Sequence, residues 1–216
     1  MDKPARRDSG LPLLYLASGN PGKLREFRHA AAEFGWAVEA VPDFKRLPHC
    51  EEDGKSFAEN ACKKALHYGR FCPEKPVFAD DSGLCVPALE GAPGIRSARF
   101  AGLEAASETI PVDDANNQKL LQELAGTENR RAYYVCVIAV ARQGKALTTF
   151  EGRVDGVILD EPRGRGGFGY DPYFFYEPLN RTFAELTPEE KFAVSHRGQA
   201  FRQLLDELAS GGPSSS

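Results

Sequence analysis

The chain has 216 residues and a formal net charge of -4, with 42% hydrophobic and 27% charged residues. This length and composition predict a soluble globular protein with one substantial domain, or one domain of two lobes. The negative charge argues against general binding to nucleic acid or to an anionic membrane. No stretch approaches the roughly 20 apolar residues of a membrane-spanning helix, and residues 1–8 lack the apolar region of a leader, so we expect a cytoplasmic protein.

The spacing of cysteine and histidine gives no indication of a metal site. The five cysteines are odd in number and scattered, without a Cys-x-x-Cys pair. Reduced thiols are therefore expected. The four histidines show neither His-x-x-x-His nor His-Glu-x-x-His spacing, so a histidine-based metal site is not expected.

The first predicted unit is a strand, a loop and a helix. Residues 1–12 are polar and read as a flexible extension, whereas 13–17 form a continuous apolar run of strand length. Small residues follow at 18–22, and then Lys23. Apolar residues continue at helical spacing as Leu24, Phe27, Ala31 and Phe34. The loop therefore lies at a helix N-terminus, which favours an anion, although a plain turn is an alternative and the Walker A spacing is absent.

An acidic segment precedes the second predicted helix. After a probable strand at 36–41, residues 50–54 read Cys-Glu-Glu-Asp-Gly. Ser56 and Glu59 predict a capping box, and the helix that follows has an apolar stripe. The stripe consists of Phe57, Ala61, Ala65 and Tyr68. A solvated acidic loop is the ordinary interpretation of 50–54, and the functional alternative is a set of metal ligands.

The strongest candidate for chemistry is the segment 76–84. Residues 76–79 read as a buried strand that ends at Asp80 and Asp81, and Ser82 and Gly83 are typical of a turn. In open α/β sheets, ligands bind beyond the carboxyl ends of the strands. Two adjacent carboxylates are costly unless a cation or hydrogen-bond donors offset their repulsion, and Mg²⁺ prefers carboxylate oxygen. A capped turn is the alternative.

The second half of the chain contains consecutive strands. Asp113 and Asp114 begin a predicted helix, and the apolar run 133–141 predicts a central strand. Residues 146–150 and 154–159 predict two further strands of an antiparallel meander. The inward side of the helix is predicted to carry Leu120, Leu121 and Leu124. Since the first half of the chain alternates strand and helix and the second half does not, we expect a mixed sheet.

Two glycine-punctuated loops are candidate ligand contacts. The loop 91–102 carries Arg96 and Arg99, which either reach a phosphate or pair with acids. In the loop 163–172, dense glycine permits close approach to a ligand, and an aromatic side chain there, Phe168 or Tyr170, can stack on a planar base.

The C-terminal part predicts two helices. Thr187 to Glu190 form a capping box with proline at the first helical position, and Lys191 follows. Residues 195–198 read Ser-His-Arg-Gly and precede an amphipathic helix, whose apolar side is formed by Phe201, Leu204, Leu205 and Leu208. Residues 210–216 are expected to be a disordered tail.

Six segments in this order resemble the inosine triphosphate pyrophosphatase (Ham1/RdgB-like) family, and its bacterial members most closely. The resemblance extends from about residue 13 to 208. The segments are Ser-Gly-Asn-x-x-Lys at 18–23, Glu-Glu at 51–52, Phe-Ala-Asp-Asp-Ser-Gly-Leu at 78–84, Gly-Ala-Pro-Gly-Ile-x-Ser-Ala-Arg at 91–99, Gly-Gly-Phe-Gly-Tyr-Asp-Pro at 166–172, and Ser-His-Arg-Gly at 195–198.

This resemblance implies an Mg²⁺-dependent pyrophosphohydrolase that cleaves ITP, dITP and XTP between the α and β phosphates. The products would be a nucleoside monophosphate and pyrophosphate, and the role would be to remove deaminated purines from the nucleotide pool. The implied fold is α/β, an elongated mixed β-sheet flanked by helices, with 13–209 forming one domain of two lobes around a central nucleotide cleft. Members of the family are usually homodimers.

The resemblance also implies roles for individual residues. Asp81 would accept a proton from the attacking water and contact the metal, whose shell Asp80, Glu51 and Glu52 would complete. The substrate would contact Ser18, Gly19, Asn20, Lys23, Ser82, Phe168, Gly169, Tyr170, Asp171, Lys191, His196 and Arg197. Of these, Lys23 and Lys191 would hold the triphosphate, Phe168 would stack on the purine, and His196 and Arg197 would contact the edge of the base.

Two alternative functions remain open at this stage. One is a Maf-type pyrophosphatase that acts on other nucleotides, and the other is a nucleotide-binding module without catalysis. The clustered carboxylates argue against the module, because a protein that only binds a nucleotide has no need for acids that repel it.

Overall fold

The computed structural model describes residues 11–102, 110–143 and 145–210. The expected flexible extension at 1–12 and disordered tail at 210–216 fall almost entirely outside these residues. The segment 13–17 contains a strand, as expected from its apolar run.

The described strands form one mixed sheet in the order β2-β1-β3-β4-β5-β6-β7. Strand β1 runs parallel to both β2 and β3, and the remaining neighbours are antiparallel. The strands are β1 (Leu13–Leu16), β2 (Ala37–Ala40), β3 (Val77–Cys85), β4 (Arg131–Arg142), β5 (Lys145–Ile158), β6 (Phe174–Tyr176) and β7 (Arg181–Thr182). The predicted mixed sheet is confirmed.

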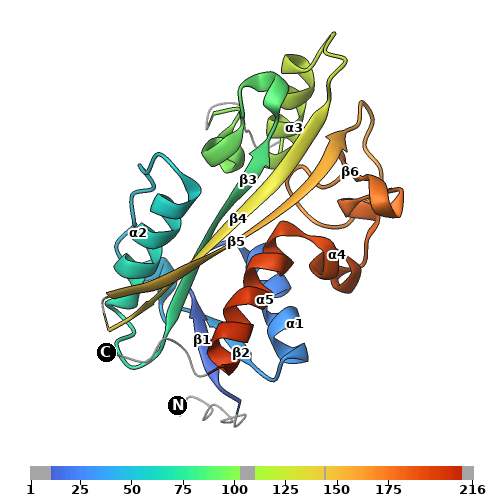
Figure 1. Cartoon of the computed structure of the whole chain (residues 1–216). Helices are drawn as coiled ribbons and strands as arrows, with labels where there is room; N and C mark the ends of the chain where they lie inside the picture. Colours follow the sequence, from blue (N-terminus) through green and yellow to red (C-terminus); the bar gives the residue numbers. More distant parts are fainter. Residues whose placement is uncertain (1–10, 103–109, 144, 211–216) are drawn as a thin grey trace, which may run out of the picture.

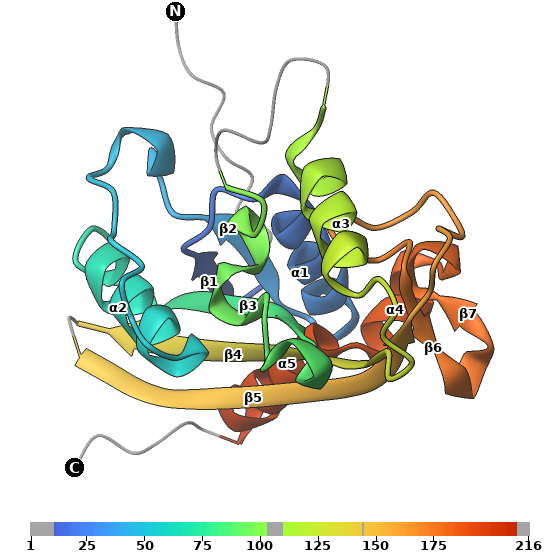
Figure 2. The ribbon, with the colours of Figure 1, turned by 90° about the horizontal axis from the view of Figure 1, so that it is seen from above.

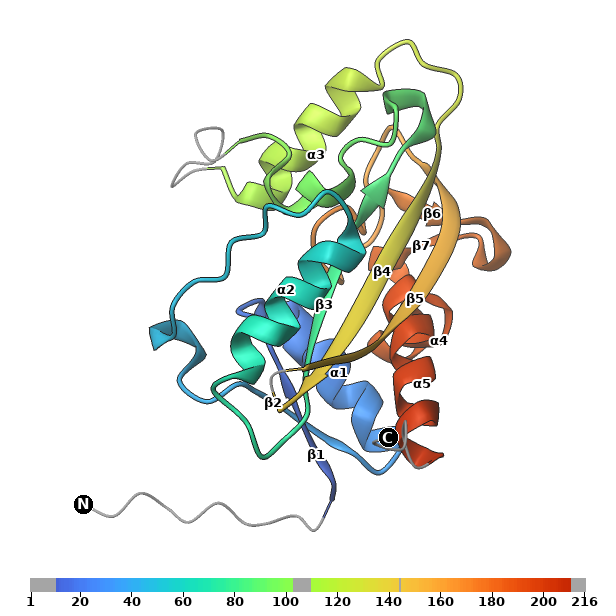
Figure 3. The ribbon, with the colours of Figure 1, turned by 60° about the vertical axis from the view of Figure 1, so that its left-hand side comes forward.

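Helices cover both faces of this sheet. They are α1 (Pro21–Glu33), α2 (Phe57–Gly69), α3 (Val112–Glu123), α4 (Pro188–Val194) and α5 (His196–Ala209). Figures 1 and 3 show α2 on one face and α1 with α5 on the other. The parallel strands β1, β2 and β3 are joined through α1 and α2, as a parallel connection requires. No helix within the described ranges is long and apolar enough to cross a membrane.

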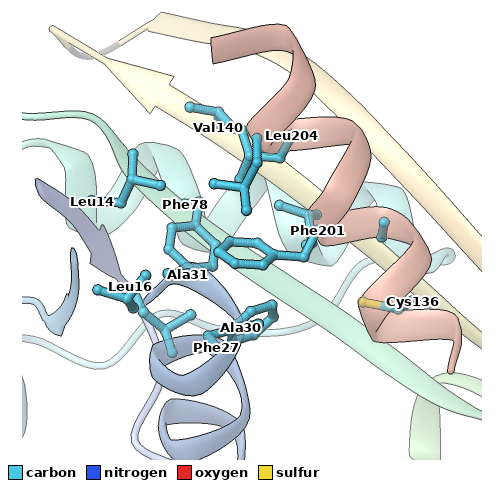
Figure 4. Packing of buried hydrophobic residues seen from close by; sticks show 14 of the residues in the cluster. Leu14, Leu16, Phe27, Ala30, Ala31, Phe78, Cys136, Val140, Phe201 and Leu204 are labelled. Atoms are coloured by element: carbon cyan, nitrogen blue, oxygen red, sulfur yellow. The ribbon is translucent and has the colours of Figure 1, made fainter. Parts of the chain in front are cut away.

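The central strand β4 is buried on both faces, which explains its continuous apolar sequence. Cys136, Ile138 and Val140 pack with α1 and α5, whereas Val135, Val137 and Ala139 pack with α2. On the α5 side, the rings of Phe27, Phe78 and Phe201 contact one another at centroid distances of 5.1, 4.8 and 5.5 Å (Figure 4). Alternate side chains of one strand thus belong to two separate cores.

A third core lies at the far end of the long strands. It contains Leu84 of β3, Leu120 and Leu124 of α3, and the stacked aromatic rings of Tyr134 and Phe183. Figure 2 shows β4 and β5 side by side, with α2 near one end and β6 with β7 near the other. Because β3, β4 and β5 are long, they pass from the first two cores into the third.

The predicted end of the third strand at Asp80 is wrong. Strand β3 continues to Cys85 and pairs with β4 along its whole length, including Asp80 with Ile138 and Asp81 with Val137. Its pairing with β1 stops at Phe78, so the edge that faced β1 becomes available to other segments. Gly83 therefore lies inside a strand and not in a turn. A glycine is needed there because a Cβ would overlap the Gly94 carbonyl oxygen and the Ser97 hydroxyl, which pack against the strand.

The predicted pair of strands at 146–150 and 154–159 is one strand, β5. Gly152 pairs with Cys136 in the middle of it and does not break it. The glycine instead admits α5, because a Cβ at this position would overlap the carbonyl oxygen of His196 and lie 2.8 Å from the amide nitrogen of Ala200. A close approach of a helix therefore explains a glycine that local sequence rules assign to a turn.

Among the smaller predictions, some are confirmed and others are wrong. The capping box of Thr187 and Glu190 is confirmed. At α2 only half of the predicted box forms, because the Ser56 hydroxyl accepts from the Glu59 amide while the Glu59 carboxylate accepts from the amide of Lys55. Phe34, expected on the inner side of α1, is 42% exposed, because it follows the last helical residue and leaves the buried face.

We predict that Gly152→Ala destabilises the protein, whereas Gly69→Ala does not. The first change forces a methyl group into the backbone of α5, and overpacking of this kind costs about 1 to 3 kcal/mol. At Gly69, the last residue of α2, a Cβ would lie at an ordinary 3.4 Å from that of Ala141. Urea denaturation of both variants measures the difference, and equal free energies of unfolding would contradict this account of β5.

Candidate active site

A cavity of about 620 Å³ lies where β1, β3, α1, α3 and α5 meet, within the 300 to 1,000 Å³ typical of small-molecule sites. Fourteen of the sixteen residues predicted from the sequence line it. They are Ser18, Gly19, Asn20, Lys23, Glu52, Asp81, Ser82, Phe168, Gly169, Tyr170, Asp171, Lys191, His196 and Arg197. Glu51 is exposed to solvent, and Asp80 is buried beneath the cavity wall.

The loop between β1 and α1 begins a helix, as predicted. The Asn20 side chain is the N-cap of α1 and accepts hydrogen bonds from the amides of Gly22 and Lys23 at 2.8 and 3.2 Å. The Lys23 ammonium lies 2.8 Å from a carboxylate oxygen of Asp80. The loop therefore presents a positive helix end and a lysine at the point where β1 stops.

Asp81 and Glu52 come together around one cation. The Lys64 ammonium lies 3.2 Å from Asp81 Oδ1 and 3.1 Å from Glu52 Oε2. The other oxygen of Asp81 accepts a hydrogen bond of 3.1 Å from the Asn60 amide. Burial raises the pKa of Asp81 above its ordinary value, although Lys64 and Lys23 act in the opposite direction. A carboxylate with a raised pKa is a better proton acceptor near neutral pH.

Asp80 faces the other side of β3, because successive side chains of a strand alternate. It lies against Lys23 and 3.7 Å from the Arg197 guanidinium, and it accepts a hydrogen bond of 3.2 Å from the Ser82 hydroxyl. Burial alone would raise its pKa, but Lys23, Arg197 and Lys64 outweigh burial and lower the pKa to about 2. Two acids adjacent in sequence thus have separate cationic partners.

A buried ionic network continues from Asp80 to the glycine-rich loop. The Glu26 carboxylate accepts from Arg197 and, at 2.8 Å, from the Lys191 ammonium, which also lies 2.6 Å from Asp171. Burial opposes ionisation of Glu26, yet the two cations lower its pKa. The ring of Phe168 lies beside both cations, 4.9 Å from the Lys191 ammonium and 5.4 Å from the Arg197 guanidinium. Phe168, which we call the aromatic wall of the cavity, therefore contacts the buried ionic network, which forms the floor of the cavity.

His196 is buried and neutral. Its ring stacks on Tyr134 at a centroid distance of 4.5 Å, and its Nδ1 is a buried atom without a hydrogen-bond partner among the described residues. Burial, assisted by the positive charges of Arg197 and Lys191, lowers the pKa of His196 well below the ordinary value of 6.5. The side chain therefore stays uncharged at neutral pH.

Sequence reasoning missed several residues of the site, among them Glu26, Asn60 and Lys64. Glu26 stands one helical turn after Lys23, so the two share a face of α1. Asn60 and Lys64 are four residues apart on α2, and both are buried. The sequence signal that could have identified them is the presence of polar residues at positions of a helix that face inward. The adjacent Ala61 and Ala65 instead favoured the interpretation of this side of α2 as apolar core.

Other predicted contacts are weaker. Arg99 lines the cavity and donates to the backbone oxygen of Glu52 at 3.4 Å, whereas Arg96 is exposed. Within 11–102, 110–143 and 145–210, no three His, Cys, Asp or Glu side chains converge as a ready metal site. All five cysteines lie inside these ranges and are free. The groups that the cavity offers for chemistry are therefore mainly pairs of lysine and carboxylate side chains and the aromatic ring of Phe168.

The fold and the cavity define an α/β protein with a site for a small, anionic ligand that carries a planar group. The sequence profile of the Ham1 family matches residues 14–207. The chain belongs to this family, and the resemblance inferred from its six segments is confirmed.

Related proteins cover nearly the whole chain. It is 47% identical over 197 residues to the dITP/XTP pyrophosphatase of Desulfotalea psychrophila, covering 91% of this chain and 85% of that protein. The dITP/XTP pyrophosphatase of Geobacter sulfurreducens is also 47% identical over 197 residues, with coverage of 90% and 96%. Among solved structures, the HAM1 protein from Coxiella burnetii is 40% identical, with a TM-score of 0.78 and coverage of 93% and 100%.

We predict that Glu26→Ala destabilises the protein by about 3 kcal/mol, because it leaves Lys191 and Arg197 buried without this shared carboxylate. The matched control is Glu33→Ala, which removes an exposed carboxylate from the last turn of the same helix. Guanidinium denaturation measures both variants. Similar stabilities of the two would show that the network around Glu26 contributes nothing.

We predict that His196→Phe removes part of the acid sensitivity of folding. An unfolded histidine binds a proton below about pH 6.5, whereas buried His196 does not. The free energy of unfolding therefore falls with decreasing pH, by about 1.4 kcal/mol per pH unit from this residue. Phenylalanine keeps the stacked ring but does not titrate.

Denaturation at pH 5.5 and 7.5 compares this variant with the wild type and with His49→Gln, whose side chain is exposed. The control should keep the wild-type pH dependence. An unchanged pH dependence of His196→Phe would contradict a neutral, buried histidine.

Proposed function

We propose that this protein is a pyrophosphohydrolase that converts ITP, dITP and XTP to the nucleoside monophosphate and pyrophosphate. The observation that carries the proposal is the convergence of Asp81 and Glu52 on one cation, in the cavity that also contains Lys23 and Phe168. The names of the relatives, dITP/XTP pyrophosphatases of similar length, support the same substrates.

Magnesium fits the acidic side of this cavity. Glu52 and Asp81 already place two carboxylates on one positive charge, that of Lys64. Mg²⁺ in proteins often binds through one or two carboxylates and completes its shell with water and substrate phosphates, so a third side-chain ligand is not needed. Bound there, Mg²⁺ would neutralise phosphate oxygens and thereby lower the barrier to attack. The metal contacts of Glu51 and Asp80 stay predictions.

Asp81 is suited to activate water. Its carboxylate is held by Asn60 on one oxygen and by Lys64 on the other, so its orientation is fixed before substrate binds. In the proposed reaction it accepts a proton from water as the water oxygen bonds to phosphorus. The bond between the α and β phosphates breaks, and pyrophosphate leaves with the electron pair.

The triphosphate would lie along the cations that border Asp81. Lys23 and the N-terminus of α1, with Ser18, Gly19 and Asn20, form one side, and Lys64 forms the other. Such fixed positive groups stabilise charge that develops on phosphate oxygens during cleavage. Lys191 is held by Glu26 and Asp171, and it would contact the nucleotide from beneath Phe168.

Purine selection would occur at the other end of the cavity. Phe168 would stack on the base, beside Gly169, Tyr170 and Asp171, while His196 and Arg197 would contact its edge. Hypoxanthine and xanthine present an oxygen at C6, which accepts from Arg197, whereas the amino group of adenine does not. A site that leaves a donor facing a donor discriminates strongly.

The wider setting is part of the same proposal. We propose a cytoplasmic homodimer in which residues 13–209 form one two-lobed domain, with a nucleotide as its ligand and no nucleic acid partner. The net charge of -4 supports the last point, and five free cysteines are typical of a reducing compartment.

We predict that the wild type releases pyrophosphate from ITP and XTP in the presence of Mg²⁺, and that Asp81→Asn lowers kcat at least about a hundredfold, as expected on loss of the general base. The matched control is Asp53→Asn, which neutralises an acid paired with Lys63 on the exposed side of the same region. Thermal melting checks that both variants fold.

Chelation by EDTA should stop the reaction, and excess Mg²⁺ should restore it. Parallel assays with dUTP and TTP test the Maf-type alternative. Faster turnover of these pyrimidine nucleotides than of ITP, or near-normal ITP hydrolysis by Asp81→Asn, would overturn the proposal.

A further inference from the structure

The first two turns of α3 hold the glycine-rich loop on both sides of a single residue, Gly169. The Gly169 amide donates to Asp113 Oδ2 at 2.7 Å, and the Gly169 carbonyl oxygen accepts from Asn117 Nδ2 at 3.0 Å. Asp113 and Asn117 are four residues apart, so they project from the same face of the helix. Helix α3 therefore holds both polar groups of one residue next to Phe168.

The loop needs such external contacts. Gly167 and Gly169 have φ angles of +71° and +63°, in the left-handed region that glycine adopts readily. Residues 161–167 are exposed, and Phe168 is only half-buried. Regular secondary structure begins again at β6, after the turn that contains Gly169. The direction of the Phe168 ring therefore depends on contacts of the loop with other segments, among them α1, since a Cβ at Gly22 would lie 3.0 Å from the ring.

Contacts on the C-terminal side fix the loop only in part. The Tyr170 hydroxyl donates to the Ser97 carbonyl oxygen at 2.8 Å, and the Phe168 amide donates to Asp171 at 2.8 Å. Gly169 lies between these points, and the interactions that hold it come from α3. On the N-terminal side, the Gly166 amide donates to the Ala184 carbonyl oxygen at 3.0 Å, so the two α3 side chains supply the attachment at Gly169 itself.

Asn117 provides an independent observation. The residue is 6% exposed, and its Oδ1 is buried without a hydrogen-bond partner in the part of the chain that the structure describes. An unpaired buried amide oxygen costs free energy that an apolar residue at this inward position of α3 would avoid. The bond from its Nδ2 to Gly169 is the compensating interaction in the described structure.

We propose that Asp113 and Asn117 are positioning residues that orient Phe168 through Gly169 and thereby control the affinity of the cavity for the nucleotide base. This inference rests on the proposed function, since it assigns Phe168 to base stacking. The side chains that hydrogen-bond Asp81 come from α2, and the further charges that act on it are those of Lys23 and Glu52, so none of these groups comes from α3. Base binding and phosphate chemistry are consequently separable by substitution.

The variants are Asp113→Ala, Asn117→Leu and Asp113→Asn. Asn117→Leu removes a donor without changing the charge, and Asn117 is not among the described residues that line the cavity, so its effect must pass through Gly169. Asp113→Asn keeps a side-chain oxygen that accepts from the Gly169 amide. The matched control is Asp114→Ala, which removes the neighbouring exposed carboxylate from the same helical turn.

Kinetics of pyrophosphate release from ITP, calorimetric binding of IMP and inhibition by pyrophosphate test the proposal. Loss of one hydrogen bond of typical strength corresponds to about a tenfold change in affinity. We expect Asp113→Ala and Asn117→Leu each to raise KM for ITP and Kd for IMP about tenfold, with kcat and pyrophosphate inhibition changed less than about twofold. Asp113→Asn should restore most of the affinity, and Asp114→Ala should behave as the wild type.

Other results have distinct meanings. A wild type that releases no pyrophosphate from ITP would overturn the proposed function itself. With an active wild type, unchanged IMP affinity in Asp113→Ala and Asn117→Leu would overturn the positioning role. Equal losses of IMP and pyrophosphate affinity, or a fall in kcat alone, would also overturn it, because these would indicate general damage to the fold. Thermal melting of each variant identifies such damage directly.

Discussion

The alternation of side chains along β3 is the constraint on which the site depends. Because Asp80 and Asp81 are consecutive in an extended strand, their carboxylates point to opposite faces of the sheet. Each then has its own ion-pair partners, Lys23 and Arg197 for Asp80 and Lys64 for Asp81, although the charges of Lys23 and Lys64 act on both carboxylates. The long pairing of β3 with β4 keeps this segment extended, so two adjacent negative charges coexist without sharing one environment.

The two faces have different consequences for chemistry. On the Asp80 side, ion pairs continue through Arg197, Glu26 and Lys191 to the aromatic wall, and only Asp80 Oδ1 and Arg197 Nε of this network lack a hydrogen-bond partner among the described residues. On the Asp81 side, burial raises the pKa of a carboxylate that faces the cavity. Asp80 is therefore suited to structure and Asp81 to proton transfer, although their sequence context is nearly the same.

Two glycines in this fold allow another segment of the chain to approach a strand closely. Gly83 admits the chain at 94–97 against β3, and Gly152 admits α5 against β5. Both lie inside strands, where local rules indicate a turn, and both led to wrong strand ends. In each case the residue whose close approach requires the glycine is distant in sequence, namely Gly94 or His196. Local periodicity carries no information about such a contact. Glu26, Asn60 and Lys64 were missed for a related reason, since their partners come from other elements.

The amino-acid sequence by itself determined the class of fold and about half of the residues that line the cavity. Apolar runs and helical spacing depend on neighbouring residues, so they predicted the mixed sheet, and six ordered segments indicated the family. Only the tertiary structure decided which charged side chains lie next to one another. It separated Asp80 from Asp81, brought Lys64 between Asp81 and Glu52, and joined α3 to Gly169. Such pairings depend on strand register and on the close approach of helices, which long-range packing sets.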